Sequence, residues 1–331
     1  MNDLPIVVLK IMAMFLVMAL GWGARRGGYI TDSIGQAMSR MLVDFIFPAL
    51  VFTQMLASVN LEILRAGWYL PLAGIAIMVI AEVVGLAAVS AAGGGSGRKT
   101  AVFLVAMPNW IYLPLPIVQG LFGAAGVRDI LLYNAGFQLA LWTIGVWTLR
   151  SSAPDLKSLK VLLMNPGLLA TAAGIALAVV FPAGTMAGRD AADLFSPALL
   201  GLAAFQALEM IGSLTIPLSL LVTGVQLGGL KMKDYLPTRS LWAVLAGRLV
   251  LAPLVTVLVF ELLALCGLRL AEIPRMTGYL IAAMPVAISC SIVTERFAGE
   301  TDLAAKSIFY STLASIATVP VFYCLVKYCC F

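Results

Sequence analysis

The chain contains no histidine, and only 11% of its 331 residues are charged. Without histidine it has no histidine proton relay, no histidine-ligated haem and no Ser-His-Asp triad. The low charge excludes an ordinary soluble domain, in which about 25% of residues are charged. Its five cysteines show neither CxxC nor zinc spacing, so the sequence predicts no disulfide framework and no structural metal. We therefore expect no cofactor and no catalytic centre.

Apolar residues dominate instead, at 62% of the chain and with a mean hydropathy of +1.02. A membrane-spanning helix needs about 20 apolar residues, so about ten spans account for the whole chain and leave no room for a soluble domain. Ten apolar stretches are visible: 5–24, 37–58, 66–92, 100–123, 129–149, 161–182, 194–228, 238–267, 276–298 and 303–327. The predicted fold class is an all-α integral membrane protein with ten transmembrane helices.

The net charge of +5 is spread along the chain, and no basic run exceeds two residues, which argues against nucleic acid as a partner. Thirteen Lys and Arg residues fall in the odd-numbered loops and six in the even-numbered loops and the C-terminus. Cytoplasmic loops carry the excess of basic residues. We therefore expect both termini to lie on the outer side of the membrane.

Short internal matches suggest a repeat of half the chain length. Ala-Met-Pro at 106–108 recurs 177 residues later at 283–285, and Phe47-Pro48 is matched by Ile216-Pro217. With five helices in each half, the second repeat must have the opposite orientation. The predicted organisation is a first five-helix repeat, a cytoplasmic linker and a second, inverted repeat at 1–150, 151–160 and 161–331.

The fourth apolar stretch carries three prolines, Pro108, Pro114 and Pro116, beside Asn109. Prolines at this density exclude a continuous helix. Interrupted backbone inside a bilayer is tolerated only where it is packed in protein or lines a wet cavity. The ninth stretch repeats the pattern with Pro285 followed by polar residues. One interpretation is a pair of broken helices that meet at a binding site, and the other is two helices merely kinked for packing.

A pair of broken helices presents free N–H groups and partial positive charge at midplane, which favours a carboxylate or another anion. Asn109 is the strongest candidate ligand, because its amide both donates and accepts hydrogen bonds. The residues expected at such a crossover and substrate site are Pro108, Asn109, Pro116, Pro285, Ser289 and Ser291.

Ionisable and amide groups within the apolar stretches form a second set of candidates. Asp44 would bind a coupling proton or cation, or pair with a buried base. Arg248 would attract the anion, or form an internal ion pair. The amides of Gln119, Asn134 and Gln138 would line a cavity or make interhelical hydrogen bonds. The sequence leaves these alternatives open.

The run Met107-Pro108-Asn109, followed by Leu115-Pro116 and by Gly-Leu-Phe-Gly at 120–123, resembles the first crossover of the auxin efflux carrier family. Ala283-Met284-Pro285 and Glu295-Arg296-Phe297 resemble its second crossover. The resemblance implies ten helices in two inverted five-helix repeats, with crossing, broken helices 4 and 9, as in bile-acid symporters. It also implies a homodimer that carries small organic anions by an elevator-like motion.

Two features separate this sequence from the plant members of that family. Val286-Ala287 follow Pro285 where the plant proteins carry a polar amide, and their long cytosolic loop is reduced here to 151–160. We therefore expect a bacterial inner-membrane permease for a mono- or dicarboxylate rather than an auxin exporter. The alternatives are a sodium- or proton-coupled symporter or antiporter of the related fold and, more remotely, a membrane sensor or enzyme without transport.

Overall fold

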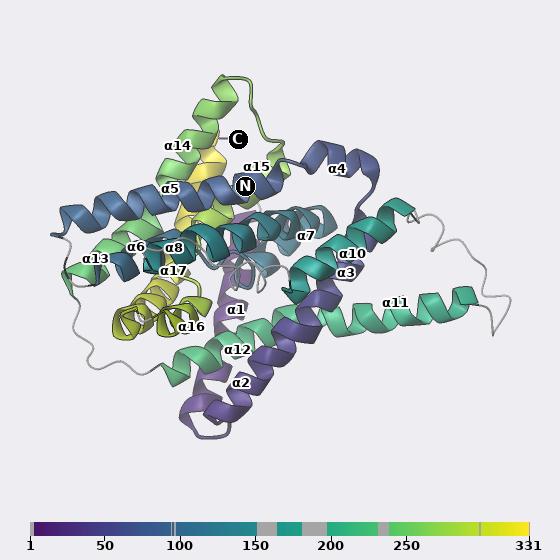
Figure 1. Cartoon of the computed structure of the whole chain (residues 1–331), viewed down its shortest axis with the longest axis horizontal. Coiled ribbons are helices and arrows are strands. Elements are labelled where there is room, and N and C mark those ends of the chain that lie inside the picture. Colours follow the sequence, from purple (N-terminus) through teal and green to yellow (C-terminus); the bar gives the residue numbers. More distant parts are fainter. Residues whose placement is uncertain are drawn as a thin grey trace.

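The computed structural model describes residues 3–93, 95, 97–150, 164–180, 197–230, 238–297 and 299–330. Within these ranges the chain is helical and has no sheet, only an isolated antiparallel bridge between Pro108 and Val286 (Figure 1). Six helical stretches of the described residues are long and apolar enough to cross a membrane: Asp32–Ala57, Leu61–Ala91, Pro114–Leu149, Leu200–Gly229, Arg239–Leu265 and Thr301–Cys330. The predicted all-α membrane architecture is confirmed at this level, and the predicted linker 151–160 lies outside the described residues.

One set of helices, called here the panel group, packs together, and α2, α11 and α12 among them follow the lower edge of Figure 1. Its members are α1 (Asp3–Arg26), α2 (Asp32–Met41), the π-helix η1 (Leu42–Ile46), α3 (Phe47–Ser58), α10 (Pro166–Val180), α11 (Pro197–Ser213) and α12 (Thr215–Gly229). Helix α1 packs on α12, and α3 packs on α10 and α11. A Cβ on Gly224 would come within 1.9 Å of the Met18 carbonyl oxygen, so glycine is what lets the α1 and α12 backbones touch.

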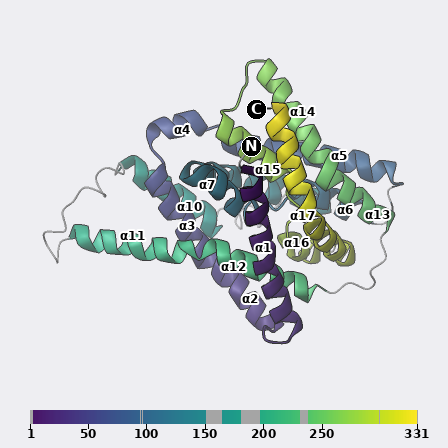
Figure 2. The same cartoon turned by 180° about the vertical axis from the view of Figure 1, so that it is seen from behind.

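The remaining long helices form a second set, called here the core group. Its members are α5 (Leu70–Ala91), α6 (Arg98–Ala106), α7 (Pro114–Ala140), η2 (Leu141–Gly145), α8 (Val146–Arg150), α13 (Arg239–Ala246), η4 (Gly247–Leu251), α14 (Ala252–Leu265), α15 (Glu272–Ala282), α16 (Ser289–Arg296) and α17 (Thr301–Cys330). Helix α5 contacts α6, α7 and α14, and α17 contacts α13 and α16. The two groups meet where α1 runs beside α17 (Figure 2) and where α1 and α3 pack against α7.

Polar residues set several helix starts. The side chains of Thr31, Asn60 and Thr238 precede α2, the short helix α4 (Leu61–Gly67) and α13, and each accepts a hydrogen bond from the N–H three residues later. Such caps satisfy N–H groups that have no partner inside the helix. The predicted stretch 66–92 overlaps both α4 and α5, and 194–228 overlaps both α11 and α12; α5 and α12 begin without a side-chain cap.

The fourth and ninth predicted stretches are both interrupted. The chain leaves the helix between α6 and α7, at residues 107–113, and between α15 and α16, at residues 283–288. These two segments are called the first and second crossover below. Each is flanked by a half-helix on both sides, as the prolines predicted. The alternative of two continuous helices that are only kinked is therefore excluded.

Helix α7 contains a chain reversal at Gly123, where φ is +58°. A Cβ on Gly126 would lie only 2.6 Å from the Val118 side chain, whereas residues eight apart in one straight helix are separated by about 12 Å. The half-helix after the first crossover therefore ends at Gly123 and the chain turns back directly. The sequence predicted a connecting segment at 124–128, and a single glycine takes its place.

Candidate functional site

The two crossovers lie against each other and pair through their backbones. The Asn109 N–H donates to the Pro285 carbonyl at 2.7 Å, and the Ala287 N–H donates to the Met107 carbonyl at 3.0 Å. These two bonds flank the Pro108–Val286 bridge. Unpaired backbone groups in a bilayer cost several kcal/mol each, so mutual pairing is what allows both helices to unwind at the same place.

Pairing across the crossovers takes donors away from the half-helices that precede them. In an uninterrupted helix the Val105 carbonyl would accept from Asn109 and the Ala282 carbonyl from Val286. Asn109 instead bonds to the second crossover, and the Val286 N–H donates to Ser311 Oγ in α17 at 3.1 Å. The last turns of α6 and α15 thus each need a replacement donor.

Arg248 of η4 replaces both donors. Its guanidinium donates to the Val105 carbonyl at 2.7 Å and to the Ala282 carbonyl, and the residue is 0% exposed. Its positive charge also interacts favourably with the partial negative charge at the two helix C-termini. Arg248 forms no ion pair with any described residue and does not line the cavity described below. Of the substrate and structural roles considered from the sequence, these contacts are of the structural kind, although they are not the expected ion pair, and the substrate role stays a prediction.

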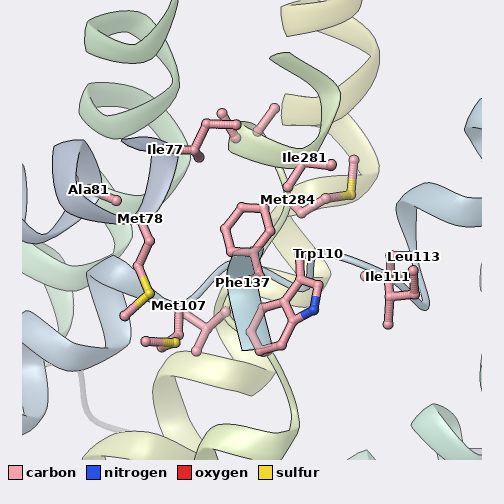
Figure 3. Packing of buried hydrophobic residues seen from close by; sticks show 14 of the residues in the cluster. Ile77, Met78, Ala81, Met107, Trp110, Ile111, Leu113, Phe137, Ile281 and Met284 are labelled. Atoms are coloured by element: carbon pink, nitrogen blue, oxygen red, sulfur yellow. The ribbon is translucent and has the colours of Figure 1, made fainter. Parts of the chain in front are cut away.

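Trp110 anchors the first crossover in the core group. Its indole stacks on Phe137 with the ring centroids 5.4 Å apart and the planes within 7° (Figure 3). Its Nε1 donates to Asn134 Oδ1 at 2.9 Å. Met107 and Met284, from the two crossovers, pack in the same buried cluster. Of the two roles open to Asn134, the structure shows the interhelical hydrogen bond, made to the crossover itself.

A cavity of about 150 Å³ lies between the crossovers and the panel group. The polar side chains in its lining are Ser39, Asn109, Tyr112, Ser219, Thr223, Gln226 and Ser289. Among the described residues that line it, none is charged, and the rest are apolar. Asn109 is 4% exposed and lines the cavity, and no described residue forms a hydrogen bond with its amide side chain. The amide is therefore open to hydrogen bonding with whatever occupies the cavity.

The cavity also meets the N-terminal ends of two half-helices. Residues 110–112 lead into α7, and Ala287, Ile288 and Ser289 lead into α16. Helix N-termini carry partial positive charge. Pro114 and Pro116 have no N–H, and the Leu115, Cys290 and Ser291 N–H groups donate to carbonyls of the preceding turn, so the charge rather than a set of free donors is what both ends offer. The lining thus favours negative charge although it contains no base. This arrangement was predicted from the prolines and from Asn109 and Ser289.

A wider space of about 460 Å³ adjoins the cavity and is called the vestibule. It is lined by Arg25, Asp32, Gln36, Arg40, Ser291 and Glu295, among others. Ser39 and Gln226 line both spaces. The Gln226 Nε2 donates to Ser39 Oγ at 2.8 Å, which places this pair at the boundary. Ser291, predicted at the crossover site, belongs to the vestibule.

Other predicted residues lie elsewhere. Pro108 and Pro285 are buried within the crossing, and Pro116 lies in the first turn of α7. Gln119 is exposed and Gln138 half-buried, and neither lines the cavity. Asp44 is exposed in η1 and also stays outside the lining. The structure thus brings together only part of the predicted set.

The sequence reasoning missed the contribution of α12. Ser219, Thr223 and Gln226 line the cavity from one face of this helix. Their spacing of four and then three residues is that of a single helical face. A polar stripe on an otherwise apolar helix was the signal that would have found them.

An α-helical membrane protein in which two interrupted helices meet at a cavity has the architecture of a membrane transporter. The membrane transport protein family model matches residues 6–323. The chain belongs to this family, the auxin efflux carrier family, as the crossover motifs predicted. No curated protein matches the chain with significant similarity.

Proposed function

We propose that the protein is a secondary transporter that moves a small organic anion, a mono- or dicarboxylate, by elevator-like alternating access. The observation that carries this proposal is the unpartnered Asn109 amide, buried in a cavity beside two half-helix N-termini. An amide and the partial positive charge of helix N-termini recognise a carboxylate without a fixed positive charge. No catalytic step forms part of the proposal.

The division of the helices supports the elevator-like motion. Both crossovers belong to the core group, whereas Ser39, Ser219, Thr223 and Gln226 belong to the panel group. The ligand site therefore lies at the boundary between two packed bodies. Displacement of the core group along the panel group would carry the crossovers, and the bound anion, from one side of the membrane to the other.

The lining also bears on the kind of anion. Because no described lining residue is basic, a second carboxylate would find no counter-charge in the cavity. Burial of an uncompensated charge is costly. We therefore place monocarboxylates ahead of dicarboxylates among the candidate substrates.

The proposed membrane arrangement is that predicted from the sequence. It comprises ten spans, with inverted repeats at 1–150 and 161–331, in the bacterial cytoplasmic membrane, with both termini outside and two copies forming a homodimer. The vestibule includes Arg25, Thr31 and Asp32, which lie in the first predicted cytoplasmic loop. Under this orientation the cavity communicates with the cytoplasm in the conformation described.

A thermal-shift screen of the purified protein against mono- and dicarboxylates tests the anion site. A ligand at 100 times its dissociation constant stabilises the folded state by about 2.7 kcal/mol. We expect at least one monocarboxylate to raise the melting temperature of the wild type, and Asn109→Ala to lose that shift. Gln119→Ala, which removes an exposed amide outside the cavity, is the matched control and should keep the full shift.

Two outcomes would contradict the proposal. If no anion stabilises the protein, with sodium present or absent, the helix-dipole argument is wrong and a cation or neutral solute becomes the candidate substrate. If an anion stabilises Asn109→Ala as well as the wild type, the ligand binds elsewhere. The ion-coupled alternative at Asp44 stays a prediction, and dependence of uptake on a sodium or proton gradient would test it.

A further inference from the structure

Glu82 lies near the middle of α5, within the most apolar of the candidate spans. The residue is half-buried, and its neighbours one turn away, Met78 and Leu86, are apolar. Its Oε1 lies 2.5 Å from Thr148 Oγ1 in α8. An ionised acid inside the bilayer costs free energy, and such a residue indicates a functional site unless a partner compensates its charge.

The hydrogen atoms at this contact can be counted. Thr148 Oγ1 lies 2.5 Å from Glu82 Oε1 and also 3.0 Å from the Ile144 carbonyl oxygen. A hydroxyl has a single proton to donate. If Glu82 were ionised, one of these two acceptors would face Thr148 Oγ1 with no proton between them. If Glu82 is a carboxylic acid, it donates to Thr148, which donates to Ile144, and both contacts are satisfied.

The second carboxyl oxygen supports the same assignment. Glu82 Oε2 is buried and has no hydrogen-bond partner. An ionised carboxylate with one buried, unpartnered oxygen would bear the full desolvation cost of its charge. The neutral acid, with a carbonyl oxygen at that position, bears far less.

Among the side chains that the structure describes, no charged group on the helices packed around α5 compensates Glu82. Arg248 of η4 is bound to the crossover carbonyls, Arg275 of α15 pairs with Glu261 of α14, and Arg128 of α7 pairs with Asp129. Arg98 of α6 donates to Ser90. The other charged residues on these helices are Lys99, Arg239 and Glu272, and none forms a described ion pair with Glu82. Thr148 is its sole described polar partner.

We propose that Glu82 is a proton-binding residue and is the neutral carboxylic acid in the conformation described. Binding forms one O–H bond on the carboxylate and takes the proton from a hydronium ion, leaving water; release reverses this step. The proton is held by the chain Glu82 to Thr148 to Ile144. Glu82 and Thr148 both belong to the core group, so, if the proposed elevator motion holds, the proton travels with the crossovers.

Infrared difference spectroscopy of the whole purified protein at pH 7 reads the protonation state without any substrate. We expect a protonated-carboxyl C=O band in the difference between the wild type and Glu82→Gln. In Thr148→Val the band should persist and shift to higher wavenumber, because the acid loses its hydrogen-bond acceptor. The matched control is Glu62→Gln, which removes an exposed acid at the start of α4 and should leave no such band.

The proposal is overturned if the wild type minus Glu82→Gln difference shows an ionised carboxylate at pH 7. It is overturned equally if Thr148→Val leaves the band unmoved, because the proton would then not lie on this hydrogen bond. Should Glu82→Gln misfold, the Thr148→Val comparison with the wild type decides alone. None of these results depends on whether an anion is transported, so failure here differs from failure of the proposed function.

Discussion

The first crossover carries its own polar side chain in the cavity and its own anchor, whereas the second takes its support from neighbouring helices. Asn109 faces the cavity from the first crossover, and Trp110 fixes that segment against Phe137 and Asn134. The second crossover continues with Val286 and Ala287 after its proline, and Ser311 of α17 satisfies its backbone. The same tripeptide, Ala-Met-Pro, opens both segments.

Under the proposed function, this difference divides recognition from support. The first crossover supplies a side chain that no described protein group satisfies, as the proposed ligand contact requires. The second supplies backbone groups and the start of α16, and its satisfied contacts hold it in place. Two crossovers that pair through their backbones therefore differ in their side-chain chemistry. This contrast can be tested with one mutation that affects both crossovers and with others that affect only one of them.

The largest effect should come from the residue that serves both crossovers. Arg248→Met removes the donors to the Val105 and Ala282 carbonyls together. Each buried carbonyl left without a partner costs about 1–3 kcal/mol, so the expected loss of unfolding free energy is about 2–6 kcal/mol. Unfolding by SDS titration in detergent micelles measures it.

Arg239→Ala is the control for that measurement. Arg239 is an exposed arginine at the start of α13, the helix that continues directly into η4, nine residues before Arg248. It should change the unfolding free energy by less than about 0.5 kcal/mol. Equal effects from the two variants would show that Arg248 does not hold the half-helix ends.

The main features of the fold could be predicted because the bilayer leaves few choices. Ten apolar stretches and three clustered prolines suffice to place helices and to exclude an unbroken fourth span. The exact interruptions were not predictable, since they depend on contacts far apart in sequence. Val286 finds its partner 25 residues away and Arg248 reaches a carbonyl 143 residues away. The reversal at Gly123 was missed for a simpler reason, as one glycine is enough for a turn that was expected to need a loop.

The site was predictable only on its crossover side. Asn109 and Ser289 follow from the prolines. Ser219, Thr223 and Gln226 lie on α12, and nothing in the sequence indicated that this helix would face the crossovers. Asn134 illustrates a limit of residue-type reasoning: an amide in a span suits a cavity and a hydrogen bond equally well. Its partner, Trp110, is fixed by the packing of α7 on the crossover.

An intermediate effect is expected where the chain leaves the first crossover's half-helix. Gly123 has φ +58° and ψ −144°, a conformation that residues with a Cβ rarely adopt, although open space surrounds the position. Gly123→Ala should cost about 1–3 kcal/mol of unfolding free energy through backbone strain alone. The thermal midpoint in detergent checks this value. Gly201→Ala, at an open helical position in α11, should cause no loss.

The second crossover leaves its half-helix differently, through Phe297 to Glu300 before α17, and depends on no single positive-φ residue among those described there. A Cβ on Gly299 in that connection would lie 2.5 Å from the Thr294 side chain, so a substitution there would cost stability through crowding rather than through backbone strain. If Gly123→Ala is as stable as Gly201→Ala, the chain reverses by another route and the contrast between the two exits fails.

The smallest stability effect, and the sharpest contrast, should come from Asn109→Ala compared with Ser311→Ala. Ser311→Ala leaves the buried Val286 N–H without its acceptor and should cost about 1–3 kcal/mol. Ser315→Ala is its control, since Ser315 donates only within α17, to the Thr312 carbonyl, and orphans no N–H group. Both are measured by SDS unfolding without ligand.

Asn109→Ala removes an amide that forms no protein hydrogen bond, so the unliganded protein should lose no more than about 0.5 kcal/mol. The same substitution should weaken carboxylate binding at least about tenfold, because a hydrogen bond to a charged group contributes about 1.5–3 kcal/mol. Ser311→Ala should behave in the opposite way, with reduced stability and retained binding in the molecules that fold. A variant of Asn109 that is as unstable as Ser311→Ala would mean that the first crossover, too, is held by its polar side chain, and the division between recognition and support would be wrong.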